Sequence, residues 1–312
     1  MTVAAHPEQQ VAGGAPATSG RRVLRVLLRD RGAVLSGAYL ALIVLMAVCA
    51  PLITAITGHG PNDFDTAAVD TDLGGVPYGA LGGISADHPL GVEPQNGRDI
   101  LARIAYGARV SLIIAASATA LTTLLGVVLG MLAGFYQGWV DQVICRVMDF
   151  LMAFPALIFM IAILSALPQG NRPVLLVVVI SVFGWPYLAR VVRGQTLTLV
   201  NREFVEAARA SGASTGALVF KEILPNLRSS LIVMTTLAVP GYVGTEAGLS
   251  FLGVGVTPPT PSWGQMISSS VGWYAVDPMY FVIPGGFLFL TVLSLTVLGD
   301  RIRAAYDAGE AA

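Results

Sequence analysis

The amino-acid sequence predicts an all-α membrane protein with six transmembrane helices. Hydrophobic residues make up 54% of the 312-residue chain and charged residues only 12%, whereas soluble domains carry about 25% charged residues. A helix needs about 20 apolar residues to cross a bilayer core, and Lys and Arg collect beside alternate apolar segments, as a multi-span topology requires. The predicted spans are 33–57, 109–134, 147–167, 174–194, 229–252 and 279–299.

Residues 1–32 are expected to form an N-terminal tail ahead of the first span. The first 20 residues are small and polar and are predicted to be disordered. The basic stretch 21–31 is expected to lie as a helix against anionic lipid of the inner leaflet. No small-residue cleavage site ends a short apolar core, so 33–57 is expected to be a retained transmembrane helix and not a cleaved signal.

The remaining spans follow an acidic segment, 58–108, and the fourth of them has the weakest pattern. Gly184, Trp185 and Pro186 interrupt its apolar run. Such residues are tolerated inside a span when neighbouring helices satisfy the backbone. A short tail, 308–312, ends the chain.

The distribution of basic residues predicts the orientation, because Lys and Arg accumulate on the cytoplasmic side. Six spans place both termini on one side. That side carries all 18 Lys and Arg residues except Arg98, Arg103, Arg109 and Arg172. Both termini and the segment 203–228 are therefore expected in the cytoplasm, with 58–108 and 253–278 outside. An odd number of spans would break this assignment.

A polar insert separates the fourth span from the fifth. Its pattern is Glu206-Ala207-Ala208, then Gly212, then Leu224-Pro225. The small residues allow another surface to approach closely, Gly212 allows a turn, and Pro225 is expected to stop a helix. The insert is predicted to form helices 203–211 and 214–223 that fit a socket on another protein.

A different interpretation of this insert is an amphipathic loop on the membrane. In that case Leu218 and Phe220 would lie in lipid. The residues of the insert by themselves leave both interpretations open.

The insert resembles the EAA motif of inner-membrane permease subunits of ABC importers. The spacing from Gly212 to Leu224-Pro225 is intact, and Glu222 stands where many relatives carry an apolar residue. Other segments, from about residue 21 to 307, resemble the oligopeptide/dipeptide (Opp/Dpp) "C" permeases. These segments are Arg25–Arg31, Ala50–Ile53, His88–Gly91, Gly97–Leu101, Tyr106–Arg109, Gly138–Asp141, Arg146–Asp149, Phe154-Pro155, Glu246–Val256, Pro258–Gly264 and Gly299–Arg303.

This resemblance implies the type I ABC importer permease fold, a five-helix core with an extra N-terminal helix, in a bacterial inner membrane. The core would span 109–307, with coupling helices at about 203–225. The implied partners are a homologous "B" permease subunit, two ATPase subunits or one fused ATPase, an extracytoplasmic substrate-binding protein and membrane lipid, but no nucleic acid. The chain would be a non-catalytic subunit that forms half of the pore.

The sequence contains no phosphate-binding GxxxxGK[ST] loop. ATP and Mg are therefore expected in the partner ATPase subunits, with no cofactor bound by this chain. The histidines His6, His59 and His88 show no ligand spacing, and the two cysteines, Cys49 and Cys145, lie in or beside apolar segments. No metal site, disulfide or catalytic residue is predicted.

By the resemblance, the insert couples ATP hydrolysis to transport as a lever. Glu206 is expected to set the docking orientation and Gly212 the bend, and Leu218 or Phe220 to fill a groove in the ATPase. The other candidate coupling residues are Ala207, Ala208, Leu224 and Pro225.

Other candidate site residues lie elsewhere in the chain. Glu246 lies inside the fifth span, where a charge is costly, and either lines the pore or makes a structural hydrogen bond. Arg98 and Asp99 either contact the binding protein or cap the second span. The loop with Pro258, Pro259 and Trp263 either reaches the binding protein or anchors at the membrane interface.

Two other functional classes fit the sequence less well. A self-contained secondary transporter predicts inverted repeats and discontinuous helices, which this sequence does not show. A membrane scaffold without transport does not explain the ordered motifs. The cargo stays open: the family suggests peptides, but its relatives also carry nickel, glutathione, haem or oligosaccharides.

Overall fold

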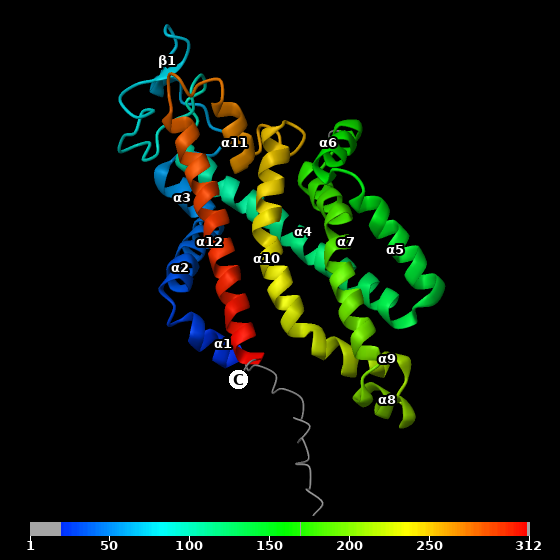
Figure 1. Ribbon diagram of the computed structural model, residues 1–312. Helices are drawn as coiled ribbons and strands as arrows, with labels where there is room; N and C mark the ends of the chain where they lie inside the picture. The colour runs from blue at the N-terminus through cyan, green and yellow to red at the C-terminus, as the bar shows by residue number, and fades with distance from the viewer. Residues whose placement is uncertain (1–19, 169, 311–312) are drawn as a thin grey trace, which may run out of the picture.

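A computed structural model describes residues 20–168 and 170–310, and most of these residues are helical (Figure 1). The first part contains α1 (Gly20–Leu27), α2 (Arg31–Val48), α3 (Ala50–Thr57), the short 3-10 helix η1 (Thr66–Ala68), and strands β1 (Val69–Asp70) and β2 (Val76–Pro77). The second part contains α4 (Ile100–Tyr136), α5 (Gly138–Met152), α6 (Ala156–Ala166), α7 (Arg172–Val200), α8 (Glu203–Ala210), α9 (Thr215–Ala217), the π-helix η2 (Leu218–Ile223), α10 (Leu224–Phe251), α11 (Trp263–Ser270) and α12 (Met279–Glu310).

The number of spans agrees with the prediction, but the third span is not a straight helix. Within the described residues, five helices are long and apolar enough to cross a membrane, and α5 with α6 forms a pair bent by 86°, which brings the number to six when the pair counts as one span. The bend follows from Pro155, which precedes α6. Proline disfavours the helical conformation of the residue before it, so the predicted span 147–167 is divided there.

Several predicted boundaries are also wrong. The first span, 33–57, is divided at Cys49 into α2 and α3, because Pro51 in the first turn of α3 has no N–H to continue the α2 ladder. The helix that contains the predicted second span, 109–134, is longer than that span and runs from Ile100 to Tyr136. The last helix continues to Glu310, so the predicted tail at 308–312 is partly helical.

Two other predictions concern the fourth span and the N-terminal region. The fourth span, α7, continues through Pro186 without a break. The basic stretch contains the helix α1, as expected. The disorder predicted for the first 20 residues concerns 1–19, which lie outside the described residues, and Gly20, where α1 begins.

The packing of α4 against α7 depends on three glycines spaced four residues apart. A methyl group added at Gly126, Gly130 or Gly134 would lie within 3.0 Å of atoms of α7, and at Gly130 only 2.6 Å from the carbonyl oxygen of Ala189. Small residues at this spacing let two helices approach closely in a membrane. These contacts form the central helix pair of the molecule.

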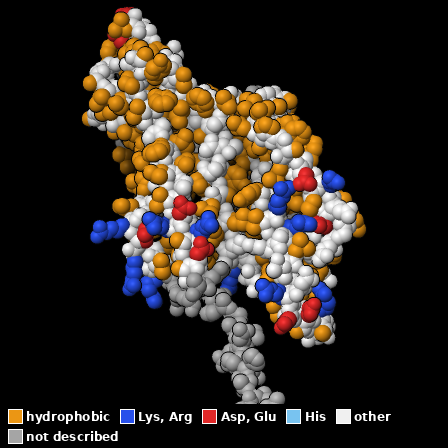
Figure 2. Space-filling view, in the orientation of Figure 1, with side chains coloured by type: hydrophobic (Ala, Val, Ile, Leu, Met, Phe, Trp, Pro, Cys, Tyr) orange, Lys and Arg blue, Asp and Glu red, His pale blue; other side chains and the backbone are white. Residues whose placement is uncertain are grey.

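The polar segments lie at the two opposite ends of the helices. Figure 1 shows β1, α3 and α11 at one end, and α1, α8, α9 and the end of α12 at the other. On the face shown in Figure 2, Lys and Arg side chains gather toward the second end. The coupling insert and both ends of the described chain therefore share one side, as the predicted topology requires.

Candidate functional site

The coupling segment comprises α8, α9 and η2, together with the turn between α8 and α9. Gly212 in this turn has φ +84°, a conformation that side-chain-bearing residues rarely adopt. The Ser214 hydroxyl then accepts a hydrogen bond from the Ala217 N–H at 3.3 Å and caps the second helix. The predicted helix, glycine turn and second helix are all present.

The expectation that Pro225 stops the second helix is wrong. Pro225 lies in the first turn of α10, and the chain from Thr215 to Phe251 forms one helical path suited to span a membrane. The proline falls where the π-helix η2 gives way to the α-helix α10, so its missing N–H coincides with a change in the hydrogen-bond pattern and the helical path continues. The coupling segment is consequently joined to the fifth span without a hinge loop.

An apolar cluster fixes the coupling segment to the rest of the chain. Leu218 is only 3% exposed, and Val205 and Ile223 are fully buried. They pack with residues of α4, α7 and α10: Met131, Leu188, Val192, Val200 and Leu227. Leu218 therefore has no exposed surface to fill a groove in a partner, contrary to the expectation for this residue.

The opposite side of the coupling segment is open to a partner. Glu206, Ala207 and Gly212 are exposed, and so is Pro225. Phe220 is 68% exposed although it is a large aromatic side chain. The remaining motif residues, Ala208 and Leu224, are half-buried. Of the two apolar residues expected to reach a partner, the fold leaves only Phe220 available.

At the other end of the molecule, Asp99 caps α4. Its Oδ1 accepts a hydrogen bond from the Ala102 N–H at 2.7 Å, and its Oδ2 lies 2.9 Å from Nδ1 of His88. Asp99 is only 1% exposed. These contacts favour the capping role over contact with a binding protein. Arg98 pairs with Glu93, its NH2 lying 2.6 Å from Oε2.

A buried arginine that the sequence interpretation did not single out joins several segments here. Arg103 Nε lies 2.5 Å from Oε1 of Glu93. Its NH2 donates to Oε1 of Gln265 in α11 at 2.8 Å, and its NH1 donates to the Pro61 carbonyl at 2.9 Å. Both charged side chains are almost fully buried. An arginine near the start of an apolar helix was the signal in the sequence for this network.

The loop after α10 is divided between exposed and buried residues. Pro258 and Pro259 are exposed and free to meet a partner protein. Trp263, in contrast, is fully buried, and its Nε1 donates to the Ile104 carbonyl at 3.3 Å. The expectation that Trp263 contacts a binding protein or the membrane interface is wrong, because the side chain packs from the start of α11 against α2, α4 and α12.

Glu246 is fully buried inside α10. The Ser250 hydroxyl donates to its Oε1 at 2.8 Å, and Ser111 and Ser262 contribute further hydroxyls around the carboxyl group. The Ser250 hydroxyl also accepts from the Val256 N–H at 3.0 Å. These contacts favour the structural interpretation, in which Glu246 holds the end of α10 against α4 and the following loop.

An open cavity of about 860 Å³ lies between α4, α7, α10 and the end of α12, with a mixed polar and apolar lining. Hydroxyl and amide side chains supply much of its lining, although most of the surrounding helices are apolar. Polar groups at membrane depth are costly unless they face a cavity or a partner. The polar residues of the lining include Thr122, Thr123, Gln195, Asn226, Ser229, Ser230, Thr235 and Tyr242.

Comparison with known proteins places this geometry in a family. Residues 126–309 match the family described as binding-protein-dependent transport system inner membrane component. Residues 18–73 match the N-terminal TM domain of oligopeptide transport permease C. A solved structure of the MetNI methionine ABC transporter in an inward-facing conformation matches with a TM-score of 0.52 and 20% sequence identity. The match covers 65% of this chain and 96% of the MetNI chain, and it supports the type I fold.

Curated relatives match over nearly the whole chain. The glutathione transport system permease protein GsiD of Pectobacterium atrosepticum is 35% identical over 290 residues, covering 93% of this chain and 91% of the relative. The oligopeptide transport system permease protein OppC of Bacillus subtilis is 38% identical over 268 residues, covering 86% and 82%. With the helical fold and the coupling segment, these matches show that the chain belongs to the family of binding-protein-dependent transport system inner membrane components and carries the N-terminal region of the oligopeptide permease C type.

Proposed function

We propose that this chain is one half of the transmembrane pore of an ATP-driven importer for small peptides. The observation that supports this proposal most directly is that the coupling segment continues into α10 without a break. Motion of the segment must reach a membrane-spanning helix, because no flexible loop separates the two. Partner ATPase subunits supply the energy, a second permease completes the pore, and a binding protein delivers cargo at the end that carries β1 and α11.

The cavity supports peptides as the cargo class. Its lining offers neutral hydroxyl and amide groups that pair with peptide N–H and C=O groups of any sequence. Arg303 and Asp307 of α12 add charge to the lining. Relatives named for glutathione and oligopeptide transport are consistent with this class.

The coupling mechanism is a lever with an exposed and an anchored side. A partner ATPase docks on the side that exposes Glu206 and Phe220. The buried side, around Leu218 and Ile223, packs against α4 and α7. When the ATPase subunits close and move the segment, this packing transmits the displacement to three spans together. The pore then alternates between its two openings. This end of the molecule lies in the cytoplasm, with both termini.

A pair of glycine substitutions tests the lever. Gly212 and Gly216 both lie in open space, with no atom within 4 Å of an added methyl group, but only Gly212 has a positive φ. We expect Gly212→Val to distort the turn and lower peptide uptake by the assembled complex at least about tenfold, since strained conformations cost about 1–3 kcal/mol. Its ATP hydrolysis should continue without stimulation by the loaded binding protein.

The matched variant Gly216→Val should transport like the wild-type complex. Uptake and ATP hydrolysis are measured on the same proteoliposomes. Stimulated hydrolysis and normal uptake in Gly212→Val would refute the lever. Normal coupling with cargo other than peptides would refute only the proposed cargo.

A further inference from the structure

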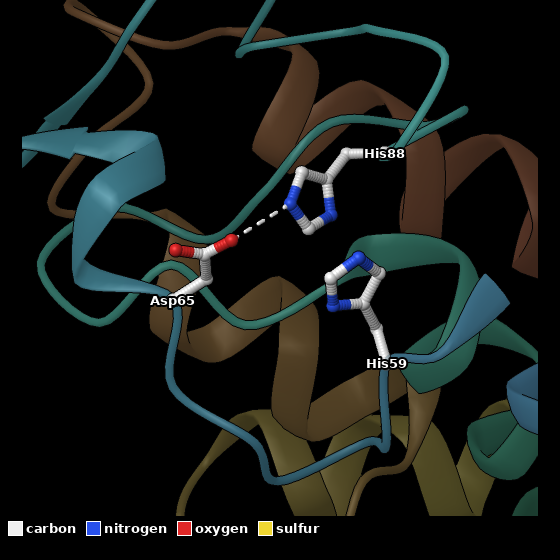
Figure 3. A group of neighbouring side chains, drawn as sticks. All are labelled: His59, Asp65 and His88. Carbon is white, nitrogen blue, oxygen red and sulfur yellow. Dashed lines mark hydrogen bonds and ion pairs between the residues drawn. The ribbon is translucent and has the colours of Figure 1, made fainter.

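Three side chains from separate loops of the segment between α3 and α4 meet in the fold. His59 follows α3, Asp65 precedes η1, and His88 belongs to the loop before α4. One ligand atom of each lies within 4.8 Å of the other two. Figure 3 shows a His88 ring nitrogen facing the Asp65 carboxylate, with the His59 ring beside them. The spacing of the histidines in the sequence indicated no ligand arrangement, whereas the fold brings His59 and His88 together with Asp65.

The hydrogen bonds of His88 define which nitrogen is available. Nδ1 lies 2.9 Å from Oδ2 of Asp99, whose other oxygen already accepts from the Ala102 N–H. An ionised Asp99 can only accept, so it holds a proton on Nδ1 of His88. The neutral ring then directs the lone pair of Nε2 toward Oδ2 of Asp65, at 3.3 Å.

Two acceptors in this position require a positive charge between them. Nε2 of His88 and Oδ2 of Asp65 would repel each other unless a proton or a metal cation is shared. His59 adds a third donor, with its ring centroid 4.3 Å from that of His88. A metal cation in this position would be bound by all three groups, whose ligand atoms lie within 4.8 Å of one another.

We propose that His59, Asp65 and His88 bind one divalent transition-metal cation, with Zn²⁺ as the best match. Two imidazole nitrogens and one carboxylate oxygen are ordinary zinc ligands and leave a fourth position open. In many such sites a carboxylate hydrogen-bonds to the metal-bound histidine, orients its ring and fixes its tautomer. Asp99 lies in this position beside His88.

The ligands need a modest closure to reach coordinating distance. Zinc–nitrogen bonds of about 2.0–2.1 Å place tetrahedral ligands roughly 3.3 Å apart, compared with spacings of up to 4.8 Å here. His59 and Asp65 are only half-buried and lie on loops, whereas His88 is buried. The two accessible ligands therefore close on the fixed one, and the metal ties the loops of 58–88 to the capped end of α4.

Metal content of the assembled complex tests this site. The complex is purified with a histidine-free tag, stripped with a chelator, dialysed against Zn²⁺ and measured by elemental mass spectrometry. The wild-type complex should hold one Zn²⁺ more per copy of this chain than complexes carrying His59→Ala or Asp65→Asn. Co²⁺ in the same site should give the visible absorption of a four-coordinate ion.

Two matched variants serve as controls. His6→Ala removes the histidine outside the cluster, and Asp72→Asn neutralises an exposed carboxylate of the same segment. Both should retain the wild-type Zn²⁺ content. Loss of a residue that only orients a metal ligand typically weakens metal binding about 10- to 100-fold. Loss of a ligand itself should therefore weaken zinc binding at least about 10-fold. Equal Zn²⁺ in the wild-type and His59→Ala complexes would overturn the proposal in favour of a protonated His88 between two carboxylates.

Discussion

At the scale of single residues, the end of the molecule that carries β1 and α11 contains a buried ion pair. Arg103 and Glu93 form an ion pair inside the protein, and Arg103 also reaches Gln265 and the Pro61 carbonyl. Removing one partner of a buried pair leaves an unpaired charge and typically costs about 3–5 kcal/mol. The network thus holds the segment that precedes α4, the start of α4 and α11 in one arrangement.

Asp277 is a buried carboxyl group at the same end, and it makes stability depend on pH. Its Oδ1 accepts from the Met279 N–H at 3.1 Å, and the side chain packs on the turn at Gly82. Burial raises the pKa of Asp277, and hydrogen bonds from the backbone N–H groups of Tyr280 and Met279 offset this only in part. The folded protein therefore holds this proton at pH values where the unfolded chain has lost it.

This shift predicts the effect of Asp277→Asn. Stability falls as pH rises from the ordinary Asp pKa of about 3.9 through the raised folded pKa, because the folded state binds more protons there. The substitution removes that loss, so we expect a higher thermal denaturation midpoint than wild type at neutral pH. The difference should shrink toward zero as pH falls through the window. The control Asp72→Asn should show no such pH dependence, and a pH-independent difference for Asp277→Asn would contradict the argument.

At the scale of elements, the contact of α4 with α7 is set by glycines. Gly130 approaches the backbone of α7 so closely that even a methyl group clashes, whereas Gly37 in α2 has open space around it. Gly130→Val should lower the thermal denaturation midpoint and the yield of folded protein, since overpacking costs about 1–3 kcal/mol. Gly37→Val should leave both near wild type. Equal midpoints for the two variants would show that the helices separate without penalty.

The coupling segment shows where element prediction from sequence succeeds and fails. A glycine between two short amphipathic patterns predicts a turn, because few other residues adopt a positive φ. Pro225 has two local meanings, helix stop and first-turn residue, and local sequence does not choose between them. The π-helix η2 continues directly into α10, so in this fold Pro225 is a residue of the first turn of α10.

At the scale of the whole molecule, the exposed coupling surface predicts assembly with an ATPase. Phe220 is 68% exposed at one end of the molecule, and Tyr274 is 65% exposed at the other. An aromatic anchor at an interface commonly contributes 2 kcal/mol or more, so Phe220→Asp should lower co-purified ATPase at least about tenfold. The second permease should still co-purify, because the substitution leaves the buried cluster intact.

The matched variant Tyr274→Asp should retain the ATPase. Quantification of each subunit by mass spectrometry after affinity purification gives the comparison. Full retention of the ATPase by Phe220→Asp would show that Phe220 does not contribute to docking. Loss of both partners would indicate a misfolded chain, which the thermal denaturation midpoint of the variant separates from a docking defect.

The sequence by itself determined the class of this protein, its spans and its coupling insert. Apolar runs, basic residues and a glycine turn are local signals, because bilayer insertion and turn geometry depend on residues close together in the chain. Helix capping is also a local signal, and the capping of α4 by Asp99 was one of two roles that the sequence left open.

Only the tertiary structure decided which side of a helix each residue faces and which distant residues meet. Leu218 and Trp263 looked like surface anchors, but packing against α4 and other elements buries both. Arg103 and Glu93 were not singled out, and His59, Asp65 and His88 come together only because loops fold over the start of α4. These contacts depend on how the loops fold back on α4 and α11, so spacing along the sequence carries no record of them.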